Sequence, residues 1–273
     1  FDELMTASAA GIFRVSGDII NGGGSGHQLI KTGVGILELA GTNTYDGPTF
    51  VNQGILLISS STNLPSSAEL VLNGGTLAIW NANNVTLQQN ISTSAAGNID
   101  IAQGRTATLS GDIAGPGLLT KLGGGTLVLT GESTNLQWQV NAGVVRLTSP
   151  VQLGDAFLNS NVLLGGGRIQ LVHPNGPTQV FNTRAFQNNA GAITSVLEIA
   201  PGLQVVQSNT GLVFGGSNGV FRIDGGGEWF LSGNTTLINT NTNNTIQVAG
   251  GSTLATNNTT GEALALTGTV RNT

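Results

Sequence analysis

The chain has 273 residues, of which 8% are charged, and its formal net charge is −5 at pH 7. Globular domains usually contain about 25% charged residues, so the composition excludes a charge-rich coiled coil, and the negative charge argues against nucleic-acid binding. Cysteine is absent, which excludes a disulfide framework, a thiolate nucleophile and a Cys-ligated metal. Apolar residues make up 39% of the chain, which is enough for a folded core.

The first element in chain order is a candidate helix at residues 1–10, expected to act as an N-terminal cap or extension. A glycine-rich loop follows at residues 22–26. It lacks the Lys-Ser/Thr pair and the helix of a phosphate-binding loop, so it is interpreted as a flexible connection.

Two segments then align at an offset of 90 residues, LIKTGVGILELAG at 29–41 and LTKLGGGTLVLTG at 119–131. The lysine, three glycines and the two later leucines coincide. Each copy continues through a polar turn to a second glycine-led apolar run, at 54–58 and 143–147. Weaker versions of the unit recur along the chain at spacings of about 18 to 29 residues, a range typical of solenoid repeats.

Each unit alternates with period two, which predicts short strands with one buried face. In the first copy Leu37 and Leu39 should point inward, and Ile36 and Glu38 outward. Many short strands suit a sandwich, a barrel or a solenoid. The recurring unit and its shared polar corners favour the solenoid, in which Thr and Asn at equivalent corners could form hydrogen-bonded ladders.

The predicted fold is therefore all-β, a parallel β-helix of about 12 coils at roughly 22 residues per coil. One domain is expected over residues 1–273, with the cap or extension at 1–10 and a loop excursion near 172–190. Leu37 and Leu127 should be equivalent inward residues of its core.

Residues 31–54, KTGVGILELAGTNTYDGPTFVNQG, closely resemble the passenger-associated repeat of bacterial autotransporters. That pattern has a Lys-x-Gly-x-Gly strand, Leu-x-Leu, a Gly-x-Asn-Thr-Tyr-x-Gly turn and a Thr-x-Val strand before a final glycine. The second copy keeps the first half and departs in the turn at 132–135 and at Gln139-Val140. The resemblance implies a right-handed parallel β-helix outside a bacterium. It implies no activity, because adhesins, proteases and stalks share this folding unit.

Candidate catalytic residues are few. His27 and His173 lie in predicted loops, and neither a Gly-x-Ser-x-Gly elbow nor another serine nucleophile motif occurs. Polysaccharide-cleaving enzymes would gather carboxylates on neighbouring coils. The nearest approach to such a group is Asp224 with Glu228, joined by Glu198 from a neighbouring coil.

Lys31 and Lys121 share one repeat position and are expected on the outer face of the coil. Three tryptophans, Trp80, Trp138 and Trp229, could line a sugar-binding face, although the last two lie within strand patterns and could equally belong to the core.

The sequence thus predicts a non-enzymatic extracellular scaffold, either an adhesin-like passenger or a subunit of a surface fibre or sheath. The alternative is a polysaccharide lyase or hydrolase on the same fold. No catalytic residue, cofactor or metal is assigned. Expected partners are a second copy or a longer chain joined through the coil ends, and host-surface or matrix glycans. Nucleic acid and membrane insertion are not expected. The expected location is the bacterial surface or the extracellular space.

Overall fold

The computed structural model describes residues 3–6, 11–82, 84–134, 136–153, 162–172, 178–181, 186–189, 193–207, 212–214, 218–232, 237–238, 243–256 and 269–272. It divides into two units, Phe1–Leu136 (unit 1) and Gln137–Thr273 (unit 2). The fold is all-β with 3% helix, and its parallel sheets form a β-solenoid, as the sequence predicts.

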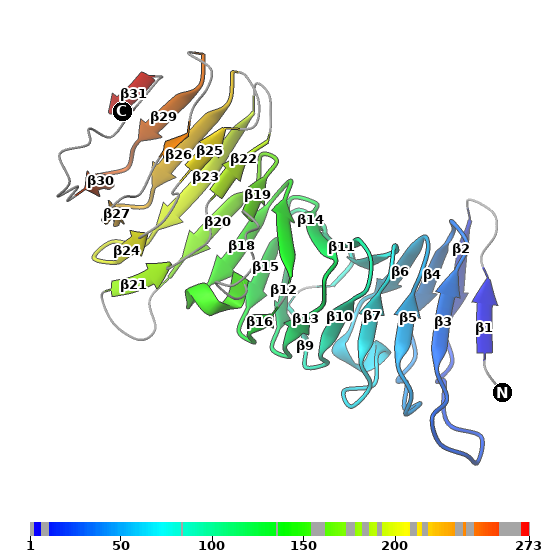
Figure 1. The fold of residues 1–273 in the computed structure, drawn as a ribbon. Helices are drawn as coiled ribbons and strands as arrows, with labels where there is room; N and C mark the ends of the chain where they lie inside the picture. Colours follow the sequence, from blue (N-terminus) through cyan, green and yellow to red (C-terminus); the bar gives the residue numbers. More distant parts are fainter. Residues whose placement is uncertain are drawn as a thin grey trace. The chain divides into compact units, whose positions relative to one another are not determined.

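Unit 1 stacks its strands in three parallel sheets, seen from blue to green in Figure 1. Sheet 1A contains β1 (Glu3–Thr6), β3 (Leu29–Thr32), β5 (Thr49–Val51), β7 (Leu70–Leu72), β10 (Ile91–Thr93), β13 (Ile113–Ala114) and β16 (Ser133–Thr134). Sheet 1B contains β2 (Ile12–Val15), β4 (Ile36–Leu39), β6 (Ile55–Ile58), β8 (Thr76–Ile79), β11 (Gly97–Ile101) and β14 (Leu118–Leu122). Sheet 1C contains β9 (Val85–Leu87), β12 (Thr106–Leu109) and β15 (Thr126–Leu129), and the 3-10 turn η1 (Ser61–Asn63) precedes it.

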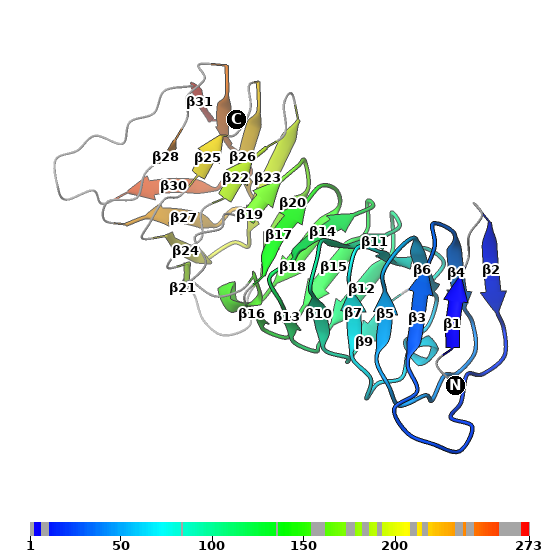
Figure 2. The ribbon, with the colours of Figure 1, turned by 45° about the vertical axis from the view of Figure 1, so that its right-hand side comes forward.

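Unit 2 repeats the arrangement with three further sets of parallel strands, which Figure 2 shows from green to red. Set 2A contains β21 (Thr178–Phe181), β24 (Gln204–Gln207), β27 (Glu228–Leu231) and β30 (Thr253–Thr256). Set 2B contains β17 (Gln137–Val140), β19 (Val162–Leu164), β22 (Phe186–Asn188), β25 (Leu212–Phe214) and β28 (Leu237–Ile238). Set 2C contains β18 (Val144–Leu147), β20 (Arg168–Leu171), β23 (Thr194–Ile199), β26 (Val220–Asp224), β29 (Thr245–Val248) and β31 (Thr269–Asn272), and η2 (Pro150–Leu153) lies between β18 and β19.

The coils of unit 2 are longer than those of unit 1. In unit 1, Leu29 pairs with Thr49 and Thr49 with Leu70, advances of 20 and 21 residues. In unit 2, Arg168 pairs with Val196 and Val196 with Arg222, advances of 28 and 26 residues. The solenoid has about 9 turns, fewer than the predicted 12 coils, and the longer coils of unit 2 account for part of the difference.

One inward row of sheet 1B shows how the core is built. Phe13, Leu37, Leu56, Leu77 and Ile99 are consecutive Cα partners on neighbouring coils. The last four side chains are at most 1% exposed. Stacking of like apolar residues at about 4.8 Å leaves no room for water, and burying each such side chain contributes about 1.5–3 kcal/mol.

The predicted strand faces are confirmed. In β4, Leu37 and Leu39 are buried, whereas Ile36 and Glu38 are half-buried on the outer face. Leu127 is also fully buried in β15. The predicted helix at residues 1–10 is wrong over Glu3–Thr6, which instead forms β1 and pairs in parallel with β3.

The two repeat copies lie on different faces of the solenoid. The first copy begins on β3 of sheet 1A, and the second begins on β14 of sheet 1B. Successive strand pairings in sheet 1A place Ile113 four coils after Leu29 at the same position. Leu119, which is the repeat equivalent of Leu29, follows Ile113 in the chain and lies on the next face, in β14. The repeat therefore encodes a strand, a corner and a strand, and this unit can be used on more than one face.

The repeat lysines are buried, so their predicted outer position is wrong. Lys31 and Lys121 are both 0% exposed. Lys121 pairs with Ile99, whose side chain faces the core, so the lysine also points inward. The Lys31 ammonium donates to the carbonyl oxygens of Thr32 at 2.8 Å, Gly33 at 2.6 Å and Gln53 at 3.1 Å. A buried cation is tolerated only when its donors are satisfied, and here corner carbonyls satisfy them.

This lysine explains the last glycine of the motif. Gly54 has φ +65°, and a Cβ placed there would lie 2.4 Å from Gly33 O and 2.7 Å from Lys31 Nζ. Glycine is therefore required both by the left-handed backbone and by the approach of the ammonium group. The same arrangement recurs in the second copy, where Lys121 donates to the carbonyls of Leu122 and Gly123.

Burial perturbs the titration of both lysines. Desolvation lowers the pKa of Lys31. Desolvation lowers the pKa of Lys121 to about 8, with the nearby Asp100 carboxylate offsetting part of the effect.

Lys121 should make folding more favourable as pH rises from about 8 towards 10.5, its ordinary pKa. In this window the unfolded chain retains the Lys121 proton and the folded chain has released it, so the free energy of unfolding increases with pH. Urea unfolding across the window measures the effect, with Lys121→Met as the control that removes the titrating group. The free energy of unfolding of the native chain, minus that of the Lys121→Met variant, should increase with pH. A difference that stays constant or decreases would contradict the lowered pKa of Lys121.

Candidate functional site

The structure brings two of the three candidate carboxylates together. Glu198 on β23 and Asp224 on β26 are Cα partners on neighbouring coils. Glu228 lies on β27, in set 2A, and is not part of that pair. The predicted proximity of Glu198 and Asp224 is confirmed, whereas the predicted grouping of Glu228 with Asp224 is wrong. The glycine corner between Asp224 and Glu228 places them on different faces of the solenoid, although they are close in sequence.

Each of these carboxylates is held by hydrogen bonds. Glu198 accepts from Gln170 at 2.7 Å and forms an ion pair with Arg168. Asp224 is ion-paired with Arg222 at 2.9 Å, and Glu228 accepts from Gln204 at 2.6 Å. A general acid or nucleophile must reach a substrate atom, whereas Glu198 and Glu228 bridge neighbouring strands and Asp224 is paired within its own strand β26. The arrangement fits cross-strand stabilisation of the outer face.

His27 lies in the loop region of unit 1 beside Asp46. Its Nδ1 is 3.9 Å from Asp46 Oδ1, too far for a hydrogen bond, and that carboxylate accepts instead from the backbone amides of Gly26 at 2.8 Å and His27 at 3.1 Å. No serine hydroxyl in the described part of the chain is hydrogen-bonded to the ring of His27. His173 lies outside the described residues. Among those that are described, no group of three or more His, Asp or Glu could hold a metal ion.

Two of the three tryptophans belong to the core. Trp138 and Trp229 are 0% exposed, and Trp229 packs edge-on against Phe186 with ring centroids 6.1 Å apart. Both indoles are therefore unavailable to a sugar, which confirms the core interpretation for these two residues. Trp80 is half-buried.

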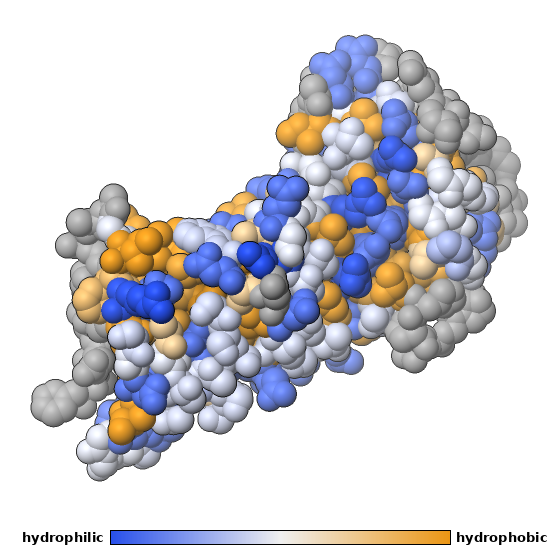
Figure 3. Space-filling model, turned by 180° about the vertical axis from the view of Figure 1, so that it is seen from behind, coloured by the Kyte–Doolittle hydropathy of each residue, from blue (hydrophilic) through white to orange (hydrophobic). Residues whose placement is uncertain are grey.

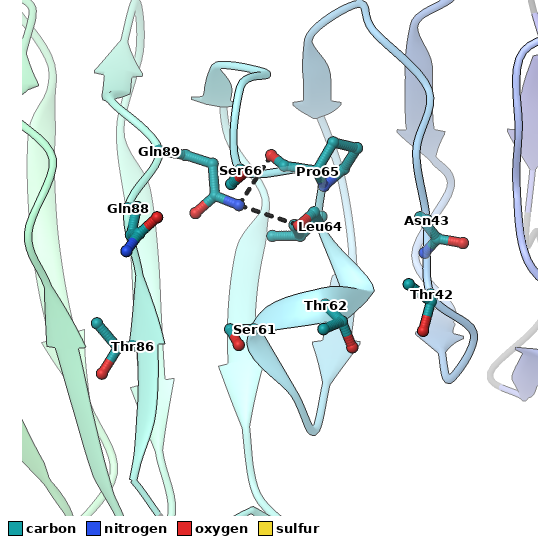
Figure 4. Close-up of a pocket in the computed structure, with 10 residues that line it drawn as sticks. All are labelled: Thr42, Asn43, Ser61, Thr62, Leu64, Pro65, Ser66, Thr86, Gln88 and Gln89. Atoms are coloured by element: carbon teal, nitrogen blue, oxygen red, sulfur yellow. Dashed lines mark hydrogen bonds between the residues drawn. The ribbon is translucent and has the colours of Figure 1, made fainter.

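A depression of about 370 Å³ opens on the side of unit 1 beside β9 (Figure 4). It is lined by residues from three successive coils, Thr42, Asn43, Ser61, Thr62, Leu64, Pro65, Ser66, Thr86, Gln88 and Gln89. β9 is the edge of sheet 1C, and the preceding coil crosses this face as η1 and an irregular segment instead of a strand. The change from turn to strand creates the hollow.

Asparagine side chains fix the walls of the depression. Ser60 and Asn63 form a capping box around η1, with Asn63 Oδ1 accepting from the amides of Ser59 at 2.9 Å and Ser60 at 2.8 Å. Asn63 Nδ2 donates to Gly41 O at 2.9 Å, and Asn43 Nδ2 donates to Asn63 O at 2.6 Å. The polar corner ladder is thus present here, although it runs from amide side chains to backbone carbonyls instead of between side chains.

Gln89 is a buried polar residue of the lining, with 4% of its surface exposed. Its Nε2 donates to the carbonyls of Leu64 at 3.1 Å and Pro65 at 2.9 Å, shown as dashed lines in Figure 4. Its Oε1 is buried and has no hydrogen-bond partner. Sequence reasoning missed this site, because its residues come from coils about 20 positions apart and carry no motif; the Gln-Gln pair at 88–89 was the only signal.

Among the described residues there is no helix long and apolar enough to cross a membrane.

The passenger-associated-transport-repeat family matches residues 29–58 and 119–147, which are the two repeat copies. No solved structure matches the chain.

Curated relatives match longer stretches. An adhesin BmaC autotransporter of Brucella suis biovar 1 (strain 1330) is 34% identical over 124 residues, which cover 44% of this chain and 4% of that protein. A probable autotransporter YfaL of Escherichia coli (strain K12) is 29% identical over 224 residues, or 73% of this chain and 17% of that protein. An extracellular serine protease of Serratia marcescens is 40% identical over 77 residues, or 28% of this chain and 7% of that protein.

The chain thus spans less than a fifth of the length of each of these relatives. Autotransporter passengers are secreted, so the chain is placed at the bacterial surface or in the extracellular space. The two repeat copies match the passenger-associated-transport-repeat family, and together with the stacked parallel coils and these relatives they support an autotransporter passenger β-helix repeat family as the one that the chain resembles.

Proposed function

We propose that the chain is a non-enzymatic section of an adhesin-like passenger, which carries binding surfaces on a β-helical scaffold outside the cell. The observation that carries this proposal is the incorporation of both repeat copies into stacked parallel coils: the first copy and the β14–β16 part of the second supply strands and corners of unit 1, and the rest of the second copy supplies β17 and β18 of unit 2. The adhesin and autotransporter names of two relatives support an adhesin-like passenger role.

The enzymatic alternative receives less support from the site residues. Glu198, Asp224 and Glu228 each bond to a neighbouring side chain, and such bonds would have to break before these groups could act on a substrate. The protease relative matches 28% of this chain and 7% of its own length. A shared coil segment of that size supports a common scaffold, and fold alone does not carry activity.

The outer end of sheet 1B supports the second part of the proposal, which concerns continuation of the coils. Phe13 occupies the same inward row as Leu37, yet it is 55% exposed because β2 is the last strand of that sheet. The neighbouring Ile12 is 62% exposed. An edge strand with apolar side chains is a template for further pairing. We propose that another coil covers it, supplied by a longer polypeptide or by a second copy stacked head to tail.

Large exposed apolar residues are otherwise scattered among the described residues, and the face in Figure 3 shows hydrophobic patches separated by polar surface. Scattered apolar residues are normal on a protein surface. Phe13 differs because it continues a core row.

A bead-adhesion assay combined with activity assays tests the main proposal. Beads coated with the purified chain should attach to epithelial cells or extracellular-matrix coats more than beads coated with an unrelated protein. Incubation with plant and bacterial polysaccharides, or with casein, should release neither reducing ends nor peptides. Release that is lost in a Glu198→Gln, Asp224→Asn variant would establish the enzymatic alternative, and absence of adhesion would remove the adhesin-like role.

Sedimentation velocity over a range of concentrations tests the open coil end. The chain should associate as concentration rises, and Phe13→Glu should suppress association because it places a charge in the apolar row. Ile20→Glu is the matched control, since Ile20 is 66% exposed and lies outside the strands. A chain that stays monomeric throughout, or two variants that behave alike, would contradict association through this end.

A further inference from the structure

We propose that the depression beside β9 binds a neutral sugar unit of a surface glycan. This inference rests on the proposed adhesin-like function and names the ligand class of one site. The observations are the volume of the depression and its lining of exposed, uncharged hydroxyl and amide groups from three successive coils.

The lining chemistry matches a polyhydroxylated ligand. Exposed Thr42, Ser61, Thr62, Ser66 and Thr86 present hydroxyl groups, and exposed Gln88 presents an amide. Hydroxyls and amides both donate and accept hydrogen bonds, as do the alternating hydroxyl groups of a sugar ring.

Gln89 fixes the wall of the depression. Its Nε2 donates to the carbonyls of Leu64 and Pro65, which ties the end of β9 to the preceding coil. Its Oε1 is buried and is not part of the proposed contact surface. A wall held in this way keeps the exposed hydroxyl and amide groups in a set arrangement, and preorganised polar groups give a pocket its orientation and specificity.

The charge of the site favours a neutral sugar over an acidic one. None of the described residues that line the depression is charged, and the chain carries a net charge of −5. A carboxylate or sulfate group would find no cation to replace its water shell. The volume of about 370 Å³ lies within the usual range of small-ligand pockets, about 300–1,000 Å³.

The edge of sheet 1C argues against a peptide as the ligand. Peptides commonly bind an open sheet edge by adding a strand, but β9 has only three residues. Such an edge offers too few backbone groups for a stable added strand.

The test is binding of the labelled chain to an array of immobilised neutral hexose and N-acetylhexosamine oligosaccharides, with sialylated and sulfated versions alongside. Binding to neutral structures is expected. A Thr86→Val, Gln88→Leu variant should weaken it by about fivefold or more, since it removes two hydrogen-bonding groups. Thr108→Val is the matched control, because Thr108 is the Cα partner of Thr86 on the next coil and does not line the depression.

The midpoint temperature of thermal unfolding must be the same in the native chain and both variants, because only then does weaker binding reflect the lost contacts and not a loss of folding. Absence of binding to every neutral glycan, or equal weakening by the control variant, would overturn the inference. Preference for the acidic glycans, or for a peptide array, would also overturn it. If the beads still adhere although glycan binding fails, only the sugar site is overturned and the adhesin-like proposal stands. If the chain binds neutral glycans but the beads do not adhere, the adhesin-like proposal is overturned and the sugar site stands.

Discussion

Each coil of unit 1 is hydrogen-bonded through its backbone to the coil before it, and this pairing decides what each sequence position can hold. Ile55 N donates to Gly35 O at 3.1 Å and Thr76 N donates to Gly54 O at 2.9 Å, so the corners repeat in register from coil to coil. A residue that faces inward on one coil must then pack on the inward residues of its neighbours. The row from Leu37 to Ile99 shows the result, since every member is apolar and buried.

The corners impose a second requirement, which the repeat lysines meet. A tight corner turns backbone carbonyls towards the interior, where an unpaired oxygen would be costly. The ammonium groups of Lys31 and Lys121 satisfy such carbonyls from inside the coil.

The sequence predicts the features that depend on alternation and repetition. The faces of β4, the parallel solenoid and the burial of Leu127 follow from period-two patterns and the two repeat copies. Lys31 was assigned to the surface because charged side chains are rarely buried, although alternation from the buried Leu29 already places it inward. The coil number was overestimated because the repeat is clear only in unit 1. The depression beside β9 was not predictable, because it depends on where a turn on one coil meets a strand on the next.

Function on such a scaffold resides in its outer surface, since the core and corners are committed to stacking. In unit 2 the outer polar residues bond to one another, as Arg146 does to Gln170 at 2.5 Å and Gln170 to Glu198. In unit 1 the depression instead gathers exposed hydroxyl and amide groups from three coils, and this is the surface that the proposed glycan would contact.

The free energy of unfolding of core variants tests the stacked inward row most directly. Urea unfolding should show that Leu37→Ala and Leu127→Ala each cost about 2–5 kcal/mol, because each leaves a cavity in a closed column. Val128→Ala, a change on the half-buried outer face of the same strand as Leu127, should cost less than about 1 kcal/mol. Losses below about 0.5 kcal/mol at both leucines would mean that these side chains do not form the core, and would contradict the account.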